Sequence, residues 1–194
     1  MNDVPVAILY HSLLGHTEAV ARCLGEGVDA LAGASASLFP VAEAERRIDD
    51  LDRFDAIVFG CPTHFGGVSA EMKRLMDQTI PQYKAARWRD KIAAGFTCGG
   101  GPSGDKQTCL IQIAVFAMQQ GMIWIGIDPL KDVRSGQGKP PGYNQWDSSI
   151  GLMATAESDD VTPASPPEAD RETARLFGRR IALATRRWMR DGAG

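Results

Sequence analysis

The chain has 194 residues, of which 44% are hydrophobic and 23% are charged, and its formal net charge at pH 7 is −3. This length and composition predict one folded domain over residues 1–194 and exclude a disordered chain. The slight negative charge excludes the strongly basic surface of a nucleic-acid-binding protein.

Strands and helices are predicted to alternate along the chain. A nearly continuous apolar run over residues 4–10 is typical of a strand buried on both faces, and apolar residues at helical spacing predict a helix over residues 16–31. The next expected elements are strands over residues 37–41, 55–60, 91–97 and 122–127 and helices over residues 69–79 and 106–120. A stretch rich in Gly, Pro, Ser and Asp over residues 128–167 is expected to be irregular, and an amphipathic helix follows over residues 168–189.

This alternation predicts an α/β protein with a parallel sheet and helices on both of its faces. In such sheets, ligands bind outside the carboxyl ends of the strands, where the strand order reverses. Three loops of unusual composition directly follow predicted strands, at residues 11–17, 61–67 and 98–104. We therefore expect these loops to form one ligand site.

The first loop, within the sequence YHSLLGHTEAV, is typical of a phosphate site. Ser12, His16 and Thr17 bring polar side chains to the start of a helix, and Gly15 allows a sharp turn. The free N–H groups of a first helical turn and the helix dipole bind phosphate without a cation. The Walker lysine is absent, so a nucleoside triphosphate with magnesium is not expected. An alternative is that Ser12 or His16 only caps the helix.

The other two loops suit a planar ligand. In the second, Pro62 and the Gly66–Gly67 pair predict a tight turn, Phe65 offers a ring face, and Ser69 is expected to cap the next helix. The third contains a GxGxxG pattern at residues 99–104, followed by Asp128 at a spacing that a dinucleotide site would use. The alternative is a glycine-rich loop that lets a ligand approach the backbone.

The cysteines and the apolar runs predict where the protein resides. The cysteines at positions 23, 61, 98 and 109 form no CxxC pair and show no metal-ligand spacing with histidine. The apolar runs are too short for a membrane span, and the acidic N-terminal segment is not typical of a secretory signal. We expect a cytoplasmic protein with reduced thiols, no bound metal and no membrane insertion.

Taken in order, the three loops resemble the flavin loops of the flavodoxin-like NAD(P)H:quinone oxidoreductases, also called tryptophan-repressor-binding-protein-like. The resemblance is carried by SxxGH at residues 12–16, PTxFG at 62–66, DQT at 77–79, QGM at 120–122 and ARxxG at 174–178. It implies a flavodoxin-like three-layer sandwich around a five-stranded parallel sheet of order 2-1-3-4-5. The GxGxxG pattern then falls inside a flavin loop, and the dinucleotide-binding interpretation is rejected.

The resemblance also implies bound FMN and two-electron transfer from NADH or NADPH to quinones, commonly in a homotetramer, so we expect a homo-oligomer (dimer or tetramer). No catalytic side chain is required, because the flavin carries the chemistry. The implied cofactor-binding residues are Ser12, Leu13, Leu14, Gly15, His16, Thr17, Pro62, Thr63, His64, Phe65, Gly66, Thr97, Cys98, Gly99, Gly100 and Gly101. The implied substrate-pocket residues are Tyr83, Gln120 and Trp146.

The chain departs from the family pattern at three of these positions. Gln120 stands where the family has a histidine, His64 where it has an arginine, and Tyr83 where it has a tryptophan. Two alternatives to a quinone reductase therefore remain. One is a one-electron carrier of the flavodoxin type, and the other is an FMN-binding regulatory module without robust reductase activity.

Overall fold

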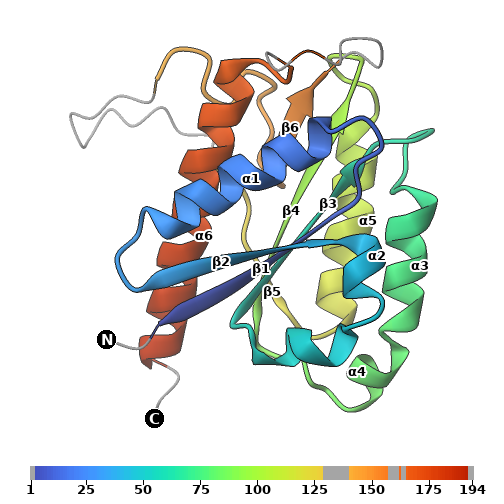
Figure 1. The fold of residues 1–194 in the computed structure, drawn as a ribbon, viewed down its shortest axis with the longest axis vertical. Coiled ribbons are helices and arrows are strands. Elements are labelled where there is room, and N and C mark those ends of the chain that lie inside the picture. The colour runs from blue at the N-terminus through green and yellow to red at the C-terminus, as the bar shows by residue number, and fades with distance from the viewer. Residues whose placement is uncertain (1–2, 129–139, 157–161, 163–164, 192–194) are drawn as a thin grey trace.

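A parallel sheet runs through the molecule, with helices on both of its faces (Figure 1). A computed structural model describes residues 3–128, 140–156, 162 and 165–191. The strands are β1 (Val4–Tyr10), β2 (Ala34–Pro40), β3 (Ala56–Pro62), β4 (Ile92–Gly99), β5 (Ile123–Trp124) and β6 (Leu152–Thr155). Their order is β2-β1-β3-β4-β5, with β6 also paired to β4, and every pairing is parallel. The predicted α/β class and the order 2-1-3-4-5 are confirmed.

The strand order reverses at β1. From β1 the chain passes to β2 on one side and then returns to β3 on the other side. Residue by residue, Val6 of β1 pairs with Ala36 of β2 and with Ala56 of β3. The carboxyl ends of β1 and β3 therefore open into the crevice where a parallel sheet of this kind binds its ligand.

Each face of the sheet has its own hydrophobic core. Helices α1 (His16–Asp29) and α6 (Glu168–Asp191) cover one face, and their apolar side chains pack against those of β1 and β4. The other face is covered by α2 (Val41–Ala44), α3 (Ala70–Gln78) and α5 (Lys106–Gln119), together with the short segments η1 (Ile48–Arg53) and α4 (Ile80–Lys84). Strands β1, β3 and β4 are buried on both sides, which explains why their sequences are almost continuously apolar.

Helices α1 and α6 cross at very short range (Figure 1). A β-carbon added to Gly27 would lie 1.9 Å from the carbonyl oxygen of Arg175, and one added to Gly178 would lie 2.0 Å from that of Leu24. Only glycine allows the two backbones to approach so closely. This contact fixes α1, whose first turn lies beside the crevice, against the long C-terminal helix.

The predicted five-stranded sheet is wrong in one respect, because two short strands flank β4 in place of one full fifth strand. β5 pairs with Ile92 and Ala93 at the start of β4, whereas β6 pairs with residues 96–99 at its carboxyl end. The fifth strand is thus shorter than the predicted range 122–127. The stretch 128–167 was predicted to be irregular but contains β6, and its residues 129–139, 157–161 and 163–164 lie outside the described part of the chain.

Among the described residues, no helix is both long enough and apolar enough to cross a membrane.

Candidate cofactor site

A cavity of about 230 Å³ lies where β1, β3, β4 and β6 end. We call it the strand-end crevice. Its lining residues are Ser12, Leu13, Leu14, His16, Thr17, Pro62, Thr63, His64, Cys98, Gly99, Gly100 and Ala156. All of them except Ala156 were predicted to bind the cofactor. The structure thus brings the three predicted loops together at one site.

The first loop is held by its own hydrogen bonds. The N–H of Gly15 donates to Oγ of Ser12 at 3.1 Å, and Gly15 has a φ of 89°, a left-handed conformation that suits glycine. Gly15, which has no side chain, is also the N-cap of α1, so neither Ser12 nor His16 occupies the N-cap position, although Ser12 accepts the hydrogen bond from the N–H of Gly15. Thr17 and His16 in the first turn are buried beside the crevice. The N–H groups of this turn are therefore those available to a ligand.

The second loop is a tight turn. His64 and Gly67 exchange two backbone hydrogen bonds of 3.0 Å, and Phe65 and Gly66 at the tip both have positive φ. The side chain of Phe65 is fully exposed and does not line the crevice, although its ring was expected to face the ligand. The ends of β3 and β4 are joined by a 2.7 Å hydrogen bond between the hydroxyls of Thr63 and Thr97.

Ser69 links the first two loops, and the sequence predicted only half of this role. Its hydroxyl caps α3 by accepting a hydrogen bond from the N–H of Met72, as expected. It also lies 2.9 Å from Nδ1 of His11, the residue that follows β1. Burial lowers the pKa of His11, and the nearby carboxylate of Glu71 opposes this effect. His11 and Ser69 therefore fix the relative positions of two crevice walls.

A buried lysine supports the third loop, and the sequence analysis missed it. The side chain of Lys106 is fully buried, and its Nζ donates to the carbonyl oxygen of Gly101 at 2.7 Å and to Oγ1 of Thr155 at 2.6 Å. Gly101 and Thr97, which were also predicted to bind the cofactor, do not line the crevice. Lysine is usually exposed, so an isolated lysine in a sequence gives no signal of such a role.

The walls of the crevice carry no formal charge. The residues that line it include no lysine, arginine, aspartate or glutamate. Burial raises the pKa of the Cys98 thiol to about 12, so this side chain is neutral at physiological pH. An anionic group bound here would be held by N–H groups and hydroxyls beside the positive end of the α1 dipole.

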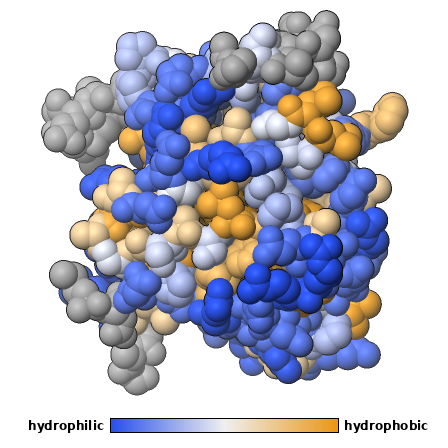
Figure 2. All heavy atoms as spheres, in the orientation of Figure 1, coloured by the Kyte–Doolittle hydropathy of each residue, from blue (hydrophilic) through white to orange (hydrophobic). Residues whose placement is uncertain are grey.

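Three exposed apolar side chains belong to the first and second loops, and we call them the apolar rim: Leu13, Leu14 and Phe65. Leu13 is 71% exposed and Leu14 is 50% exposed, although both belong to the lining of the crevice. Figure 2 shows strongly hydrophobic atoms gathered at the upper right of this face, over the loop that joins β1 to α1. Exposed apolar groups gathered around a cavity are typical of a ligand or partner site.

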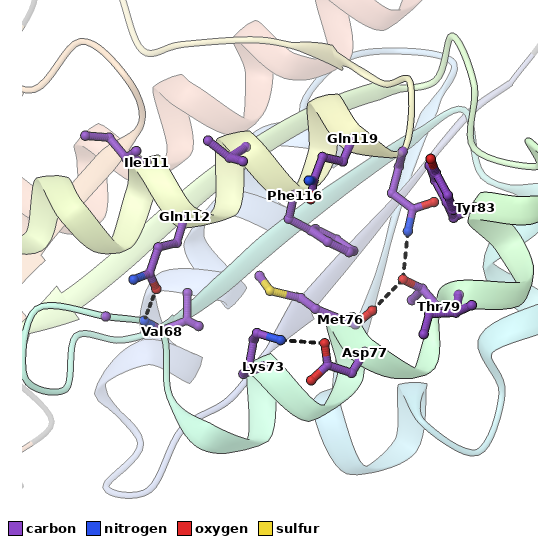
Figure 3. A pocket seen from close by; sticks show the side chains of 14 residues that line it. Val68, Lys73, Met76, Asp77, Thr79, Tyr83, Ile111, Gln112, Phe116 and Gln119 are labelled. Carbon is purple, nitrogen blue, oxygen red and sulfur yellow. Dashed lines mark hydrogen bonds and ion pairs between the residues drawn. The ribbon is translucent and has the colours of Figure 1, made fainter.

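A second and larger cavity, about 970 Å³, lies between α3 and α5 (Figure 3). This α3–α5 groove is lined by Gly67, Val68, Lys73, Met76, Asp77, Thr79, Ile80, Tyr83, Ile111, Gln112, Val115, Phe116, Gln119 and Gln120. Figure 3 shows α5 side chains on one wall and side chains of α3 and α4 on the other. Nε2 of Gln120 donates to the hydroxyl of Thr79 at 2.8 Å, while its Oε1 is buried without a partner.

The structure separates the predicted substrate-pocket residues from the crevice. Tyr83 and Gln120 share the α3–α5 groove, but Trp146 lines neither this groove nor the crevice. Gln112 accepts a hydrogen bond from the N–H of Val68, at the end of the groove nearest the second loop. Gln120 follows eight positions later, which corresponds to about 12 Å along a helix. One chain therefore does not bring Tyr83, Gln120 and Trp146 together.

The sequence matches the profile of the family described as NADPH-dependent FMN reductase over residues 15–127, more than half of the chain. The chain belongs to this family. As an FMN reductase family member, it is 33% identical over 180 residues to "Flavodoxin FldP" of Pseudomonas aeruginosa, a match that covers 90% of this chain and 93% of that protein. It is 27% identical over 201 residues to an "NAD(P)H dehydrogenase (quinone)" of Archaeoglobus fulgidus, with 91% and 95% covered.

A solved structure supports the same conclusion. The WrbA-like flavodoxin of Agrobacterium tumefaciens matches with a TM-score of 0.73 and 29% identity, over 95% of this chain and 99% of that chain. The predicted family, its flavodoxin-like fold, FMN as cofactor and NAD(P)H as electron donor are confirmed. The chain is thus an FMN-dependent oxidoreductase of this family. Which residues hold the cofactor stays a prediction that the geometry above supports.

Proposed function

We propose that the protein transfers two electrons from NAD(P)H to a quinone or a similar acceptor, with FMN held in the strand-end crevice. The observation that carries this proposal is the meeting of three loops around an uncharged cavity beside the first turn of α1. The family supplies the cofactor and the electron donor, and the crevice is the place in this fold that suits them.

The first loop would hold the FMN phosphate. The hydroxyls of Ser12 and Thr17, the ring of His16 and the N–H groups of the first turn of α1 all lie at this end of the crevice. The helix dipole contributes up to about 2 kcal/mol for an anion in a partly buried site. The dipole of α1 would thus take the place of a cationic side chain, and a phosphate could bind beside residues that carry no formal charge.

The second and third loops would flank the isoalloxazine ring. Pro62, Thr63 and His64 line one edge of the site, and Cys98, Gly99 and Gly100 line the other. The hydrogen bond between Thr63 and Thr97 fixes the distance between these edges, and Gly99 and Gly100 let a flat ring lie close to the backbone. Bound FMN supplies the hydride chemistry, and the protein orients the ring and excludes water.

The apolar rim would receive the nicotinamide and the acceptor. Leu13 and Leu14 are exposed at the mouth of the crevice and Phe65 at the tip of the second loop, where a planar, largely apolar quinone ring could contact them. Burial of apolar surface contributes about 25 cal/mol per Å² of contact. Such a rim binds flat apolar molecules without selecting strongly among them, which suits a quinone class better than one defined substrate.

We further propose a homo-oligomer (dimer or tetramer) in which a second copy covers the α3–α5 groove. Ile80, Tyr83, Ile111 and Val115 of this groove are all more than 40% exposed, an unusual gathering of large apolar side chains. A second copy seated here would also bring Tyr83 and Gln120 beside a flavin, that of the partner. This arrangement reconciles their predicted role with their distance from the crevice of their own chain.

A cytoplasmic location is proposed as well. Cys23, Cys61, Cys98 and Cys109 are all free and buried. Free thiols are typical of proteins in reducing compartments.

The proposed function is tested by an anaerobic titration of the FMN-loaded protein with NADPH, followed by visible absorbance. We expect complete loss of the oxidised flavin absorbance at one equivalent of NADPH, and its return on addition of a quinone. A set of quinones of different size would then define the acceptor. Bound flavin that NADPH does not reduce would overturn the reductase proposal.

A one-electron carrier is the second candidate, and it is favoured by the relative named flavodoxin. A carrier would take electrons from a protein donor and would not be reduced by NADPH directly. The NADPH titration therefore separates the two candidates.

A further inference from the structure

The buried side chain of Lys106 carries an inference about the properties of the bound cofactor. Lys106 is the first residue of α5, and its side chain is completely buried. Its Nζ donates to the carbonyl oxygens of Gly101 at 2.7 Å and Pro102 at 3.4 Å and to Oγ1 of Thr155 at 2.6 Å. Three acceptors use all three hydrogens of an ammonium group. The geometry is therefore that of a charged lysine.

A buried carboxylate balances this charge through Thr155. Asp170 is 1% exposed, and its Oδ2 accepts a hydrogen bond from the N–H of Thr155 at 2.8 Å. Its Oδ1 accepts hydrogen bonds from Gln145 and from Nε1 of Trp146, at 2.8 and 3.0 Å. The ring of Trp146 in turn lies 5.1 Å from Nζ of Lys106, within the range of a cation–π contact. We call Lys106, Thr155, Asp170 and Trp146 the Lys106 cluster.

Within this cluster, the side chain of Lys106 lies directly behind the wall of the crevice. A β-carbon added to Gly99, which lines the crevice, would lie 3.4 Å from Cε of Lys106. The neighbouring Cys98 senses both charges. Lys106 lowers the pKa of its thiol, and Asp170 raises it by a smaller amount. Of the two buried charges, that of Lys106 therefore acts more strongly on this lining residue.

We propose that Lys106 is a positioning residue that raises the reduction potential of FMN in this protein, by holding a positive charge directly behind the Gly99 wall. The inference rests on the proposed placement of FMN in the strand-end crevice. The reduced cofactor carries more negative charge than the oxidised one, so a nearby buried cation stabilises the reduced form more. Asp170 acts in the opposite direction and limits the effect. A higher potential favours electron uptake from NAD(P)H.

The test compares three variants by the two-electron midpoint potential of bound FMN, measured against a reference dye in a spectroelectrochemical cell. Lys106→Met keeps the length of the side chain and removes the charge. We expect reduced FMN to bind about tenfold more weakly relative to oxidised FMN, which lowers the potential by about 30 mV. Asp170→Asn removes the opposing charge and is expected to shift the potential upward.

Thr155→Val is the matched control. It removes one hydrogen-bond partner of the ammonium and keeps both charges, so it is expected to leave the potential unchanged. A purely structural role of Lys106 would weaken the binding of oxidised and reduced FMN equally, and no potential would then move. Should Lys106→Met not fold, the upward shift in Asp170→Asn still tests the proposal.

Two results overturn the inference in distinguishable ways. An unchanged potential in both charge variants, with FMN bound to each, contradicts the role of Lys106 and leaves the proposed function intact. Wild-type protein that binds no FMN contradicts the placement of the cofactor, and with it both proposals. Thermal melts of the apoproteins show whether each variant is folded.

Discussion

The strand-end crevice and the α3–α5 groove differ in volume, in the groups that line them and in the kind of ligand that they suit. The groove is about four times larger, 970 against 230 Å³, yet it is a surface between two helices, lined mostly by long side chains. The crevice is lined by loop backbone, glycines and small polar groups at the ends of parallel strands. The comparison teaches that the volume of a cavity says less about its ligand than the groups that line it. The smaller cavity is the one that the topology and the first turn of α1 prepare for an anion.

The largest expected effect comes from a negative charge in the crevice. Ser12→Glu places a carboxylate in the loop proposed to bind phosphate, and like charges in contact cost several kcal/mol. FMN affinity, measured by fluorescence titration, is expected to fall by at least about 100-fold, equivalent to about 2.7 kcal/mol. Riboflavin, which lacks the phosphate, is expected to be affected much less. Equal losses for both ligands would contradict the assignment of this loop.

A charge in the groove should act on assembly. Val115 is 46% exposed and lines the groove, so Val115→Asp is expected to leave the fold intact and to convert the oligomer to monomers. The molar mass from light scattering measures this change. Met189→Asp is the matched control, because Met189 is 47% exposed on α6 and lies outside the groove lining. A monomeric wild type, or the same result for both variants, would contradict the proposed interface.

A smaller effect is expected at the tip of the second loop. Phe65 has a φ of 48°, which aspartate tolerates, so Phe65→Asp should leave the apoprotein folded. Since its ring lies outside the crevice lining, it can contact bound FMN only at the edge, and we expect FMN affinity to fall by no more than about tenfold, or about 1.4 kcal/mol. Phe65→Asn separates the loss of the ring from the added charge. An affinity equal to that of the wild type would sink the predicted ring contact.

The smallest expected effect is on the pH dependence of stability, through His11 at the end of β1. Burial lowers the pKa of His11 in the folded state, so the unfolded chain binds this proton more readily. Stability from this source is fully present above the unfolded value of about 6.5 and is lost as the pH falls below it. His11→Gln should therefore make the free energy of unfolding less dependent on pH below about 6.5. Urea unfolding over this range measures the slope, and parallel slopes would show that His11 does not contribute.

The sequence predicted most of the sheet because its strands are long and buried on both faces. Apolar runs locate β1, β3 and β4, and the polar or glycine-rich loops after them meet as expected. β6 was missed because the apolar signal of its four residues is too short to stand out in a Gly- and Pro-rich stretch. β6 forms because it pairs with the carboxyl end of β4, a segment that lies more than 50 positions earlier in the sequence.

The site was predicted less completely for two physical reasons. Lysine side chains are usually exposed, so the sequence gives no sign that Lys106 is buried. Its burial depends on hydrogen-bond acceptors of Gly101 and Thr155, which only the folded structure brings to it. A sequence motif also does not show how far along a helix a residue lies from the ligand site. Gln120 and Tyr83 match family positions, yet α5 carries Gln120 away from the crevice of its own chain.

The late position of β6 has a consequence for the order in which the protein matures during synthesis. β5 follows α5 directly, so the five strands of the main order form from the first 124 residues. β6 and Asp170 complete the support of the third loop, and Ala156 completes the crevice, only after a long return of the chain. Pairings between distant segments form slowly, because loop closure comes before the gain in contacts. We therefore expect a nascent chain to form its main sheet before the crevice is complete, so that a cofactor held there would bind late in folding.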